Sequence, residues 1–165
     1  MEKTKHPIFL KAISSLAFCF VLSGFLLVRA NKSKKDFNLV SGVVEYIGKS
    51  SPLYPNKNPD KYRFLKIDAY NKPFELFIGK ATGDFKPTLE KLSLLLPGDS
   101  IDVYYDENFS TRKEPVNRLA YFIDRGKETI FIKGNWEQYL AFFLIGLSAV
   151  ILVWVAILKR KGKIR

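Results

Sequence analysis

Two long apolar runs bracket the chain, and the residues between them follow a different pattern. The first run covers residues 8–28 and the second covers residues 139–158. Each is close to the ~20 residues that cross a hydrocarbon core of ~30 Å. Residues 36–135 instead form short segments rich in Val, Ile, Phe and Tyr, separated by Pro, Gly and Asn. This pattern predicts two transmembrane helices that flank a small β-rich domain.

The middle domain shows six segments with strand character and one with helical spacing. Strands are predicted at 37–47, 62–69, 74–78, 100–105, 118–123 and 128–132, and a short helix at 88–96. This order is that of the OB-fold, a small Greek-key barrel, and a mixed β-sandwich is the alternative. Gly42 within the first strand indicates a bulge or a close approach of another backbone.

The net charge of +11 is concentrated beside the apolar runs. Residues 1–30 carry +3, residues 159–165 carry +5, and the long middle carries only +3. This distribution argues against a soluble nucleic-acid-binding protein and indicates membrane topology. The basic tail 159–165 is expected in the cytoplasm, so that both termini are cytoplasmic and residues 36–135 lie outside the plasma membrane.

The first apolar run has two interpretations. Val28-Arg29-Ala30 resembles the small-residue site at which a signal peptide is cleaved. The run is long for a signal peptide, however, and Lys32, Lys34 and Lys35 follow it directly. These features favour an uncleaved signal-anchor helix, and cleavage is the alternative.

Few catalytic groups are present. The only histidine is His6, before the first run, and the only cysteine is Cys19, within it. The middle domain therefore lacks the residues for a His-dependent nucleophile or a zinc site. We expect no cofactor, no metal and no enzymatic activity. The alternative that composition leaves open is an envelope hydrolase with a Ser–Lys pair.

Aromatic side chains in the predicted strands indicate an interaction surface. Five of them fall opposite the expected inward positions: Phe64, Phe77, Tyr104, Phe122 and Phe131. We interpret them as a face that contacts another membrane or envelope protein, or a second copy of the chain. A glycan- or peptide-binding barrel is the alternative. Nucleic acid is not an expected partner, because acidic residues nearly balance the basic ones in this domain.

Small residues within the two apolar runs predict a helix-packing face. Ser15, Cys19 and Ser23 are spaced by four and fall on one side of a helix. Gly146 and Ala149 form a weaker set in the second run. The bilayer is the expected partner of the remaining apolar surface.

Two short motifs in the middle domain carry a resemblance. Ser41-Gly42-Val43-Val44-Glu45-Tyr46 begins the domain, and residues 97–106 (PGDSIDVYYD) end its main part. A "G-x-V-V" strand followed by this later strand, between two membrane helices, resembles an uncharacterised bacterial family of two-helix membrane proteins with a small β domain. This chain departs from the family's pattern in its Pro-rich insertion at 51–60 and in the absence of a proline after Asp106. The resemblance implies the membrane topology and no particular reaction.

Overall fold

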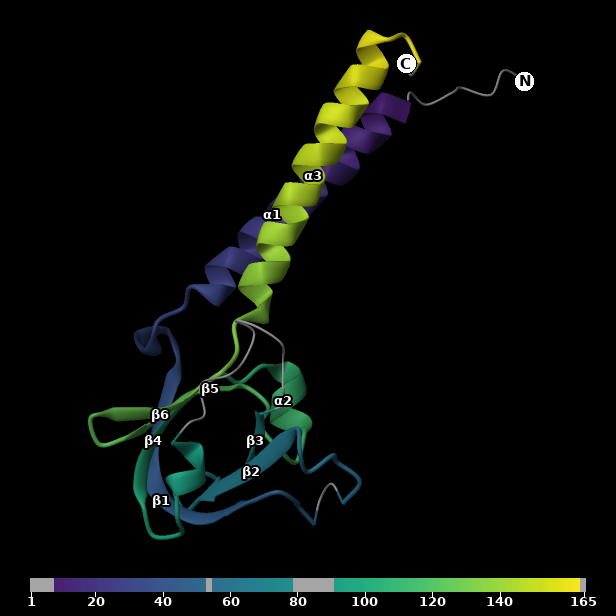
Figure 1. Ribbon diagram of the computed structural model, residues 1–165. Coiled ribbons are helices and arrows are strands. Elements are labelled where there is room, and N and C mark those ends of the chain that lie inside the picture. The colour runs from purple at the N-terminus through teal and green to yellow at the C-terminus, as the bar shows by residue number, and fades with distance from the viewer. Residues whose placement is uncertain (1–7, 53–54, 79–90, 164–165) are drawn as a thin grey trace. The chain divides into compact units, whose positions relative to one another are not determined.

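The computed structural model describes residues 8–52, 55–78 and 91–163, which form two separate compact units. One unit combines the two ends of the chain, up to Asn31 and from Trp136 onwards. The other unit, Lys32–Asn135, contains every described strand. We call it the β unit and the first one the helix pair (Figure 1).

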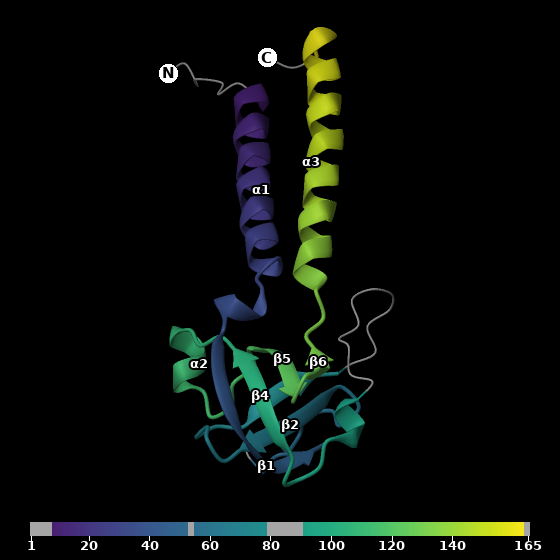
Figure 2. The same ribbon diagram turned by 90° about the vertical axis from the view of Figure 1, so that its left-hand side faces the viewer.

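The helix pair consists of α1 (Ile8–Ala30) and α3 (Trp136–Arg160). The two helices run side by side in opposite directions, so the start of α1 and the end of α3 lie at the same end (Figures 1 and 2). At ~1.5 Å per residue they are ~34 Å and ~37 Å long. Both are uninterrupted because neither contains a proline.

The β unit is built on one antiparallel sheet of six strands in the order β3-β2-β1-β4-β5-β6. The first three strands are β1 (Asn38–Gly48), β2 (Tyr62–Ile67) and β3 (Phe74–Phe77). The next three are β4 (Ser100–Tyr105), β5 (Ala120–Arg125) and β6 (Glu128–Ile132). Short helical segments connect them: η1 (Lys34–Asp36), η3 (Leu92–Leu94) and α2 (Phe109–Lys113).

Strand β1 is shared between the two halves of the sheet. Its first half pairs with β4, and its second half pairs with β2 after a bulge between Val44 and Tyr46. The bulge lets one long strand change direction and serve both neighbours. An isolated parallel bridge also joins Phe74 of β3 to Asn117, just before β5. Its hydrogen bonds run from Glu75 N to Asn117 O (2.8 Å) and from Asn117 N to Pro73 O (2.9 Å).

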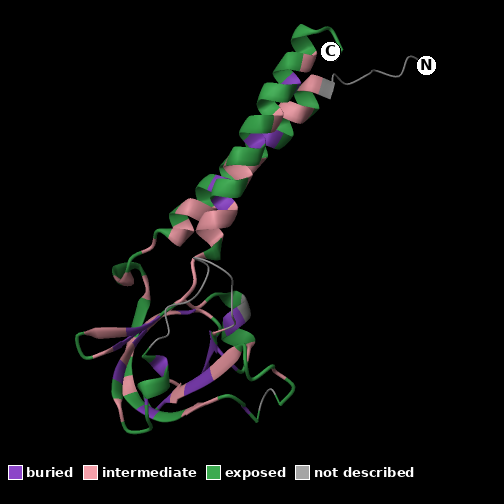
Figure 3. Cartoon of the chain, viewed as in Figure 1, coloured by how far each residue is buried: buried purple, intermediate pink, exposed green. Residues whose placement is uncertain are grey.

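The core of the β unit lies on the inner face of this sheet. One cross-strand row contributes Val40, Val103, Ile123 and Phe131. A second part comes from β2 and β3 and includes Leu65, Ile67 and Leu76. Leu92 and Leu95, in and beside η3, close the core on another side. The buried positions are coloured purple in Figure 3.

The strands agree with the sequence predictions to within two residues. The position of the bulge, the predicted helix 88–96 and helix α2 differ from them. Gly42 has regular pairing, so the bulge lies beyond it. A Cβ at Gly42 would lie 2.6 Å from the side-chain atom Asp68 Oδ1 and 3.3 Å from the backbone atom Ala69 N, so another segment does approach closely here. Part of the predicted helix 88–96 lies outside the described residues, and its described part forms only the 3₁₀ turn η3.

Helix α2 was not predicted. Its N-cap is Asn108, whose Oδ1 accepts from Thr111 N (2.9 Å), while Thr111 Oγ1 accepts from Asn108 N (2.9 Å). This reciprocal capping stabilises a helix of only five residues, too short to show hydrophobic periodicity.

Candidate functional site

The helix pair exposes most of its apolar surface. Both Phe9–Ala30 and Trp136–Arg160 are long and apolar enough to cross a membrane. Only 11% and 17% of their most apolar stretches are buried, whereas a core helix of a soluble domain is mostly buried. Phe18, Phe25, Val150 and Trp154 are among the large exposed side chains. An apolar surface of this extent requires a non-aqueous environment or a partner.

Buried small residues define the seam between the two helices. On α3, Ala141, Ser148 and Val155 recur every seven residues, and on α1 Leu16 and Ser23 do the same. A spacing of seven keeps one side of each helix against its neighbour. The Ser23 hydroxyl donates to the Cys19 carbonyl oxygen (2.7 Å), so this buried polar group is satisfied within its own helix.

The residues predicted for the packing face lie at different positions relative to this seam. Ser23 lies in the seam and Cys19 is half-buried, but Ser15, Gly146 and Ala149 are exposed. A Cβ added at Gly146 would meet no atom within 4 Å. A spacing of four from Ser23 leads back through Cys19 to Ser15. The packed side instead follows a repeat of seven, and seven residues before Ser23 lies the buried Leu16.

Interactions at both ends hold the helix pair in register. Arg29 Nε lies 3.2 Å from Glu137 Oε2, near the end of α1 and the start of α3. At the opposite ends, Lys159 Nζ lies 3.7 Å from the centre of the Phe9 ring. These contacts fix the antiparallel arrangement of the pair.

The five aromatic residues predicted as one face do not share a face. Phe64 and Phe131 are completely buried. Phe77 is 45% exposed on the edge strand β3, where its ring contacts Tyr62. Only Tyr104 and Phe122 lie together, with ring centres 6.3 Å apart on β4 and β5.

Two local features explain why Phe131 and Phe64 are buried. Ile130 has no partner in the register of β5 and β6, and this irregularity turns Phe131 to the same side as Ile123, into the core. Phe64 pairs with Gly48, over which the side chain of Tyr46 folds. The loop after β1 also reaches this side, since Lys57 Nζ contacts Glu75 Oε1 (2.8 Å) next to Phe64.

Tyr104 and Phe122 belong to a different exposed surface, which crosses four strands. Leu39 pairs with Tyr104, Tyr104 with Phe122, and Phe122 with Ile132. Leu39 is 54% exposed and Ile132 is 37% exposed. We call these four residues the outer row. It lies on the opposite side of the sheet from the core row that ends in Phe131.

Lys34 lies beside the outer row and was not predicted as a site residue. Its ammonium contacts both carboxylate oxygens of Asp124 (2.6 and 2.7 Å) and donates to Thr129 Oγ1 (2.8 Å). It also lies 5.3 Å from the centre of the Tyr104 ring and 5.6 Å from that of Phe122. The sequence shows the lysine but not these partners, which follow it by about 90 residues.

The two chain ends of the β unit are fastened together. The Phe37 ring stacks on Tyr121, with ring centres 4.3 Å apart. Lys133 N donates to Tyr121 O (2.8 Å), and Lys133 Nζ lies 4.3 Å from the Tyr121 ring centre. The segment that follows α1 and the segment that precedes α3 thus meet at one tyrosine.

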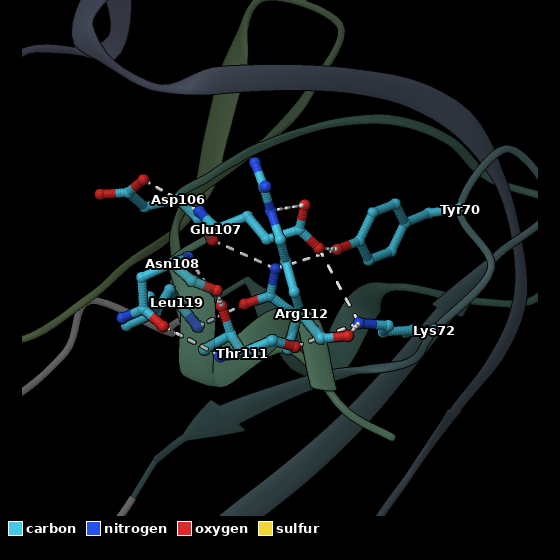
Figure 4. Close-up of polar contacts among 9 residues, drawn as sticks. Tyr70, Lys72, Asp106, Glu107, Asn108, Thr111, Arg112 and Leu119 are labelled. Carbon is cyan, nitrogen blue, oxygen red and sulfur yellow. Dashed lines mark hydrogen bonds and ion pairs between the residues drawn. The ribbon is translucent and has the colours of Figure 1, made fainter. Parts of the chain in front are cut away.

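A polar network closes the end of the sheet around α2 (Figure 4). Glu107 accepts from Tyr70 Oη (3.3 Å) and forms ion pairs with Lys72 (3.9 Å) and Arg112 (3.5 Å). Buried Asn117 donates to Tyr70 Oη (3.1 Å). Burial raises the pKa of the Tyr70 phenol above its ordinary value. The network joins the segment between β2 and β3 to α2 and to the segment before β5.

Across residues 8–52, 55–78 and 91–163, no group of three or more His, Cys, Asp or Glu side chains is placed to hold a metal ion. A lysine amine does contact a hydroxyl at Lys34 and Thr129, but this ammonium is paired with Asp124. A charged ammonium has no lone pair with which to activate a nucleophile.

Comparisons with protein-family models, with curated proteins and with solved structures found no match to this chain.

We predict that the seam tolerates bulk at Gly146 and not at Ser148. Ser148→Leu overfills a buried position and is expected to destabilise the helix pair by about 1–3 kcal/mol. Gly146→Leu, two residues away on the same helix, adds its side chain to an exposed side and should change stability by about 0.5 kcal/mol or less. The measurement is unfolding of the full chain in mixed detergent micelles with increasing dodecyl sulfate, followed by circular dichroism. Equal destabilisation by the two variants would contradict this seam.

Proposed function

We propose that the protein is a two-span integral membrane protein of the cell envelope, with a non-catalytic β unit that acts in binding or assembly. The observation that carries the proposal is the exposed apolar surface of α1 and α3. Removal of apolar surface from water is favourable by roughly 25 cal/mol per Å². Exposed side chains such as Phe18 and Trp154 therefore have a lower free energy in a bilayer than in water.

The orientation follows from the charge at the two ends of the helix pair. The tail 159–165 has five basic residues and no acidic one. Clusters of Lys and Arg within a few residues of a span are retained in the cytoplasm. Together with the antiparallel arrangement of the helices, this charge supports a topology with both termini in the cytoplasm and the β unit outside the plasma membrane. A chain with this topology fits the uncharacterised bacterial family that its two motifs resemble.

The β unit is proposed to be an OB-like barrel. The shared strand β1, paired with β2 on one side and β4 on the other, supports this assignment. The parallel bridge between Phe74 and Asn117 supports it further, because it joins β3 to the segment before β5. In this interpretation β6 extends the sheet from β5 and leads the chain back to the membrane.

The outer row is the surface that we propose for assembly. Exposed Leu39 and Ile132 continue the apolar surface of Tyr104 and Phe122 across four strands. The row is also near the chain ends of the β unit, because Phe37 contacts Phe122 with ring centres 5.9 Å apart. Only five residues separate Phe37 from Asn31 along the chain. This placement suits contact with a second copy or with a neighbouring membrane protein.

Topology is tested by labelling single cysteines in spheroplasts with a membrane-impermeant maleimide. In a Cys19→Ala background, Asn56→Cys places the thiol in the loop before β2, and Lys161→Cys places it after α3. We expect Asn56→Cys to react in intact spheroplasts and Lys161→Cys to react only after permeabilisation. The reverse pattern would place the β unit in the cytoplasm, and loss of a tag fused before Met1 would indicate a cleaved signal peptide.

Assembly through the outer row is tested by photocrosslinking in intact membranes. A benzoylphenylalanine at Phe122 should form a discrete adduct, whereas the same group at Phe77, an exposed aromatic position outside the row, should not. An adduct of twice the chain mass identifies a second copy, and another discrete mass identifies a different protein. Equal adducts from Phe77 and Phe122, or none from Phe122, would contradict this surface.

A further inference from the structure

The β unit contains an apolar pocket of about 630 Å³ beside its core. Its walls are formed by Ile47 at the end of β1, Ile78 just after β3, and Leu92 and Leu95 in and beside η3. These side chains are part of the hydrophobic core or pack against it. The pocket is therefore a continuation of the core that the described residues leave unfilled, and its volume is within the ~300–1,000 Å³ of small-molecule sites.

Arg63 is the unexpected residue of this pocket. It precedes Leu65 and Ile67 by two and four positions on β2, so it lies on the same side of the strand as these two buried residues. Residues on the inner face of a sheet are normally apolar. Arg63 is half-buried there. Partial loss of water around a charged group favours polar partners for it.

The backbone holds the Arg63 guanidinium in place without neutralising it. Nη1 donates to the carbonyl oxygens of Pro59 and Tyr62, the latter at 2.9 Å. Carbonyl oxygens are neutral, so the full positive charge of the guanidinium remains. A second cation, Lys49, lines the same pocket, and the described residues that line it include no aspartate or glutamate.

We propose that this pocket binds an aliphatic carboxylate, with its anionic group at Arg63 and Lys49 and its chain against Ile47, Ile78, Leu92 and Leu95. A guanidinium fork matches the two oxygens of a carboxylate, and the apolar walls match an alkyl chain. Sugars and nucleotides fit less well, because a site for them needs many polar groups, and among residues 8–52, 55–78 and 91–163 Ser93 is the only neutral polar side chain that lines the pocket. This ligand site goes beyond the proposed assembly role and does not depend on the orientation of the protein in the membrane.

The test is a titration of the full chain in phosphatidylcholine nanodiscs with octanoate, followed by methyl NMR of the isoleucines. Saturable shifts are expected for the methyl groups of Ile47 and Ile78, while those of Ile101 and Ile123, which do not line the pocket, serve as internal references. Octan-1-ol has the same chain without the charge, and we expect it to bind at least tenfold more weakly. Empty nanodiscs correct for partition of either compound into lipid.

Variants separate the two cations from general electrostatic attraction. Arg63→Met should weaken octanoate binding at least tenfold, and Lys49→Met should weaken it about threefold, because exposed Lys49 is not held in one position. Lys127→Met removes the same charge from the exposed turn between β5 and β6, and it should leave the affinity unchanged. If Arg63→Met changes the reference signals, Arg63→Lys, which keeps the charge and loses the fork, should bind with intermediate affinity.

Three results would overturn the proposal. The first is the absence of saturable shifts at Ile47 and Ile78. The second is equal affinity for octanoate and octan-1-ol, which would indicate an apolar cavity without anion recognition. The third is undiminished octanoate affinity in a correctly folded Arg63→Met or Arg63→Lys variant. None of these outcomes bears on the membrane topology, which the cysteine labelling tests separately.

Discussion

The exposed apolar surface of α1 and α3 is the constraint on which the account of this protein depends. The helices bury only a narrow seam against each other, in which Ser23, Ala141 and Ser148 permit close approach. Phe18 and Phe25 on α1, and Trp154 on α3, remain outside that seam. A bilayer would satisfy these side chains, and it would also constrain how the β unit is connected. A unit between two antiparallel spans must have its chain ends close together, and the Phe37–Tyr121 stack with Lys133 provides this closure.

Within the β unit, the shared strand β1 organises the sheet. Gly42 allows Asp68 and Ala69 to approach, and Asp68 Oδ1 accepts from Val43 N (2.8 Å) just before the bulge. The bulge then directs the second half of β1 to β2. Strand β1 pairs with β2 in one half of the sheet and with β4 in the other. One side of the sheet encloses the core and its pocket, and the opposite side carries the outer row. The two proposed activities, assembly and ligand binding, thus use opposite sides of one sheet.

Much of the fold could be predicted from the sequence, because apolar runs and strand alternation are local signals. The strands and the close approach at Gly42 follow from such signals. The site was harder to predict, because it depends on long-range register. The irregularity at Ile130 reverses the expected side of Phe131, and the cover over Phe64 comes from Tyr46 and the loop after β1. In the helix pair, a spacing of four indicated Ser15, whereas packing follows a repeat of seven through Ser23.

The most direct test of the central claim is the collision accessibility of spin labels along α3 in lipid bilayers, in a Cys19→Ala background. Labels on Val150→Cys, near the middle of the helix, are expected to show high accessibility to oxygen and low accessibility to a water-soluble nickel chelate. Labels on Asn56→Cys in the β unit and on Lys161→Cys after α3 should show the reverse. Equal nickel accessibility at Val150→Cys and Lys161→Cys would mean that α3 does not cross the membrane, and it would contradict the account.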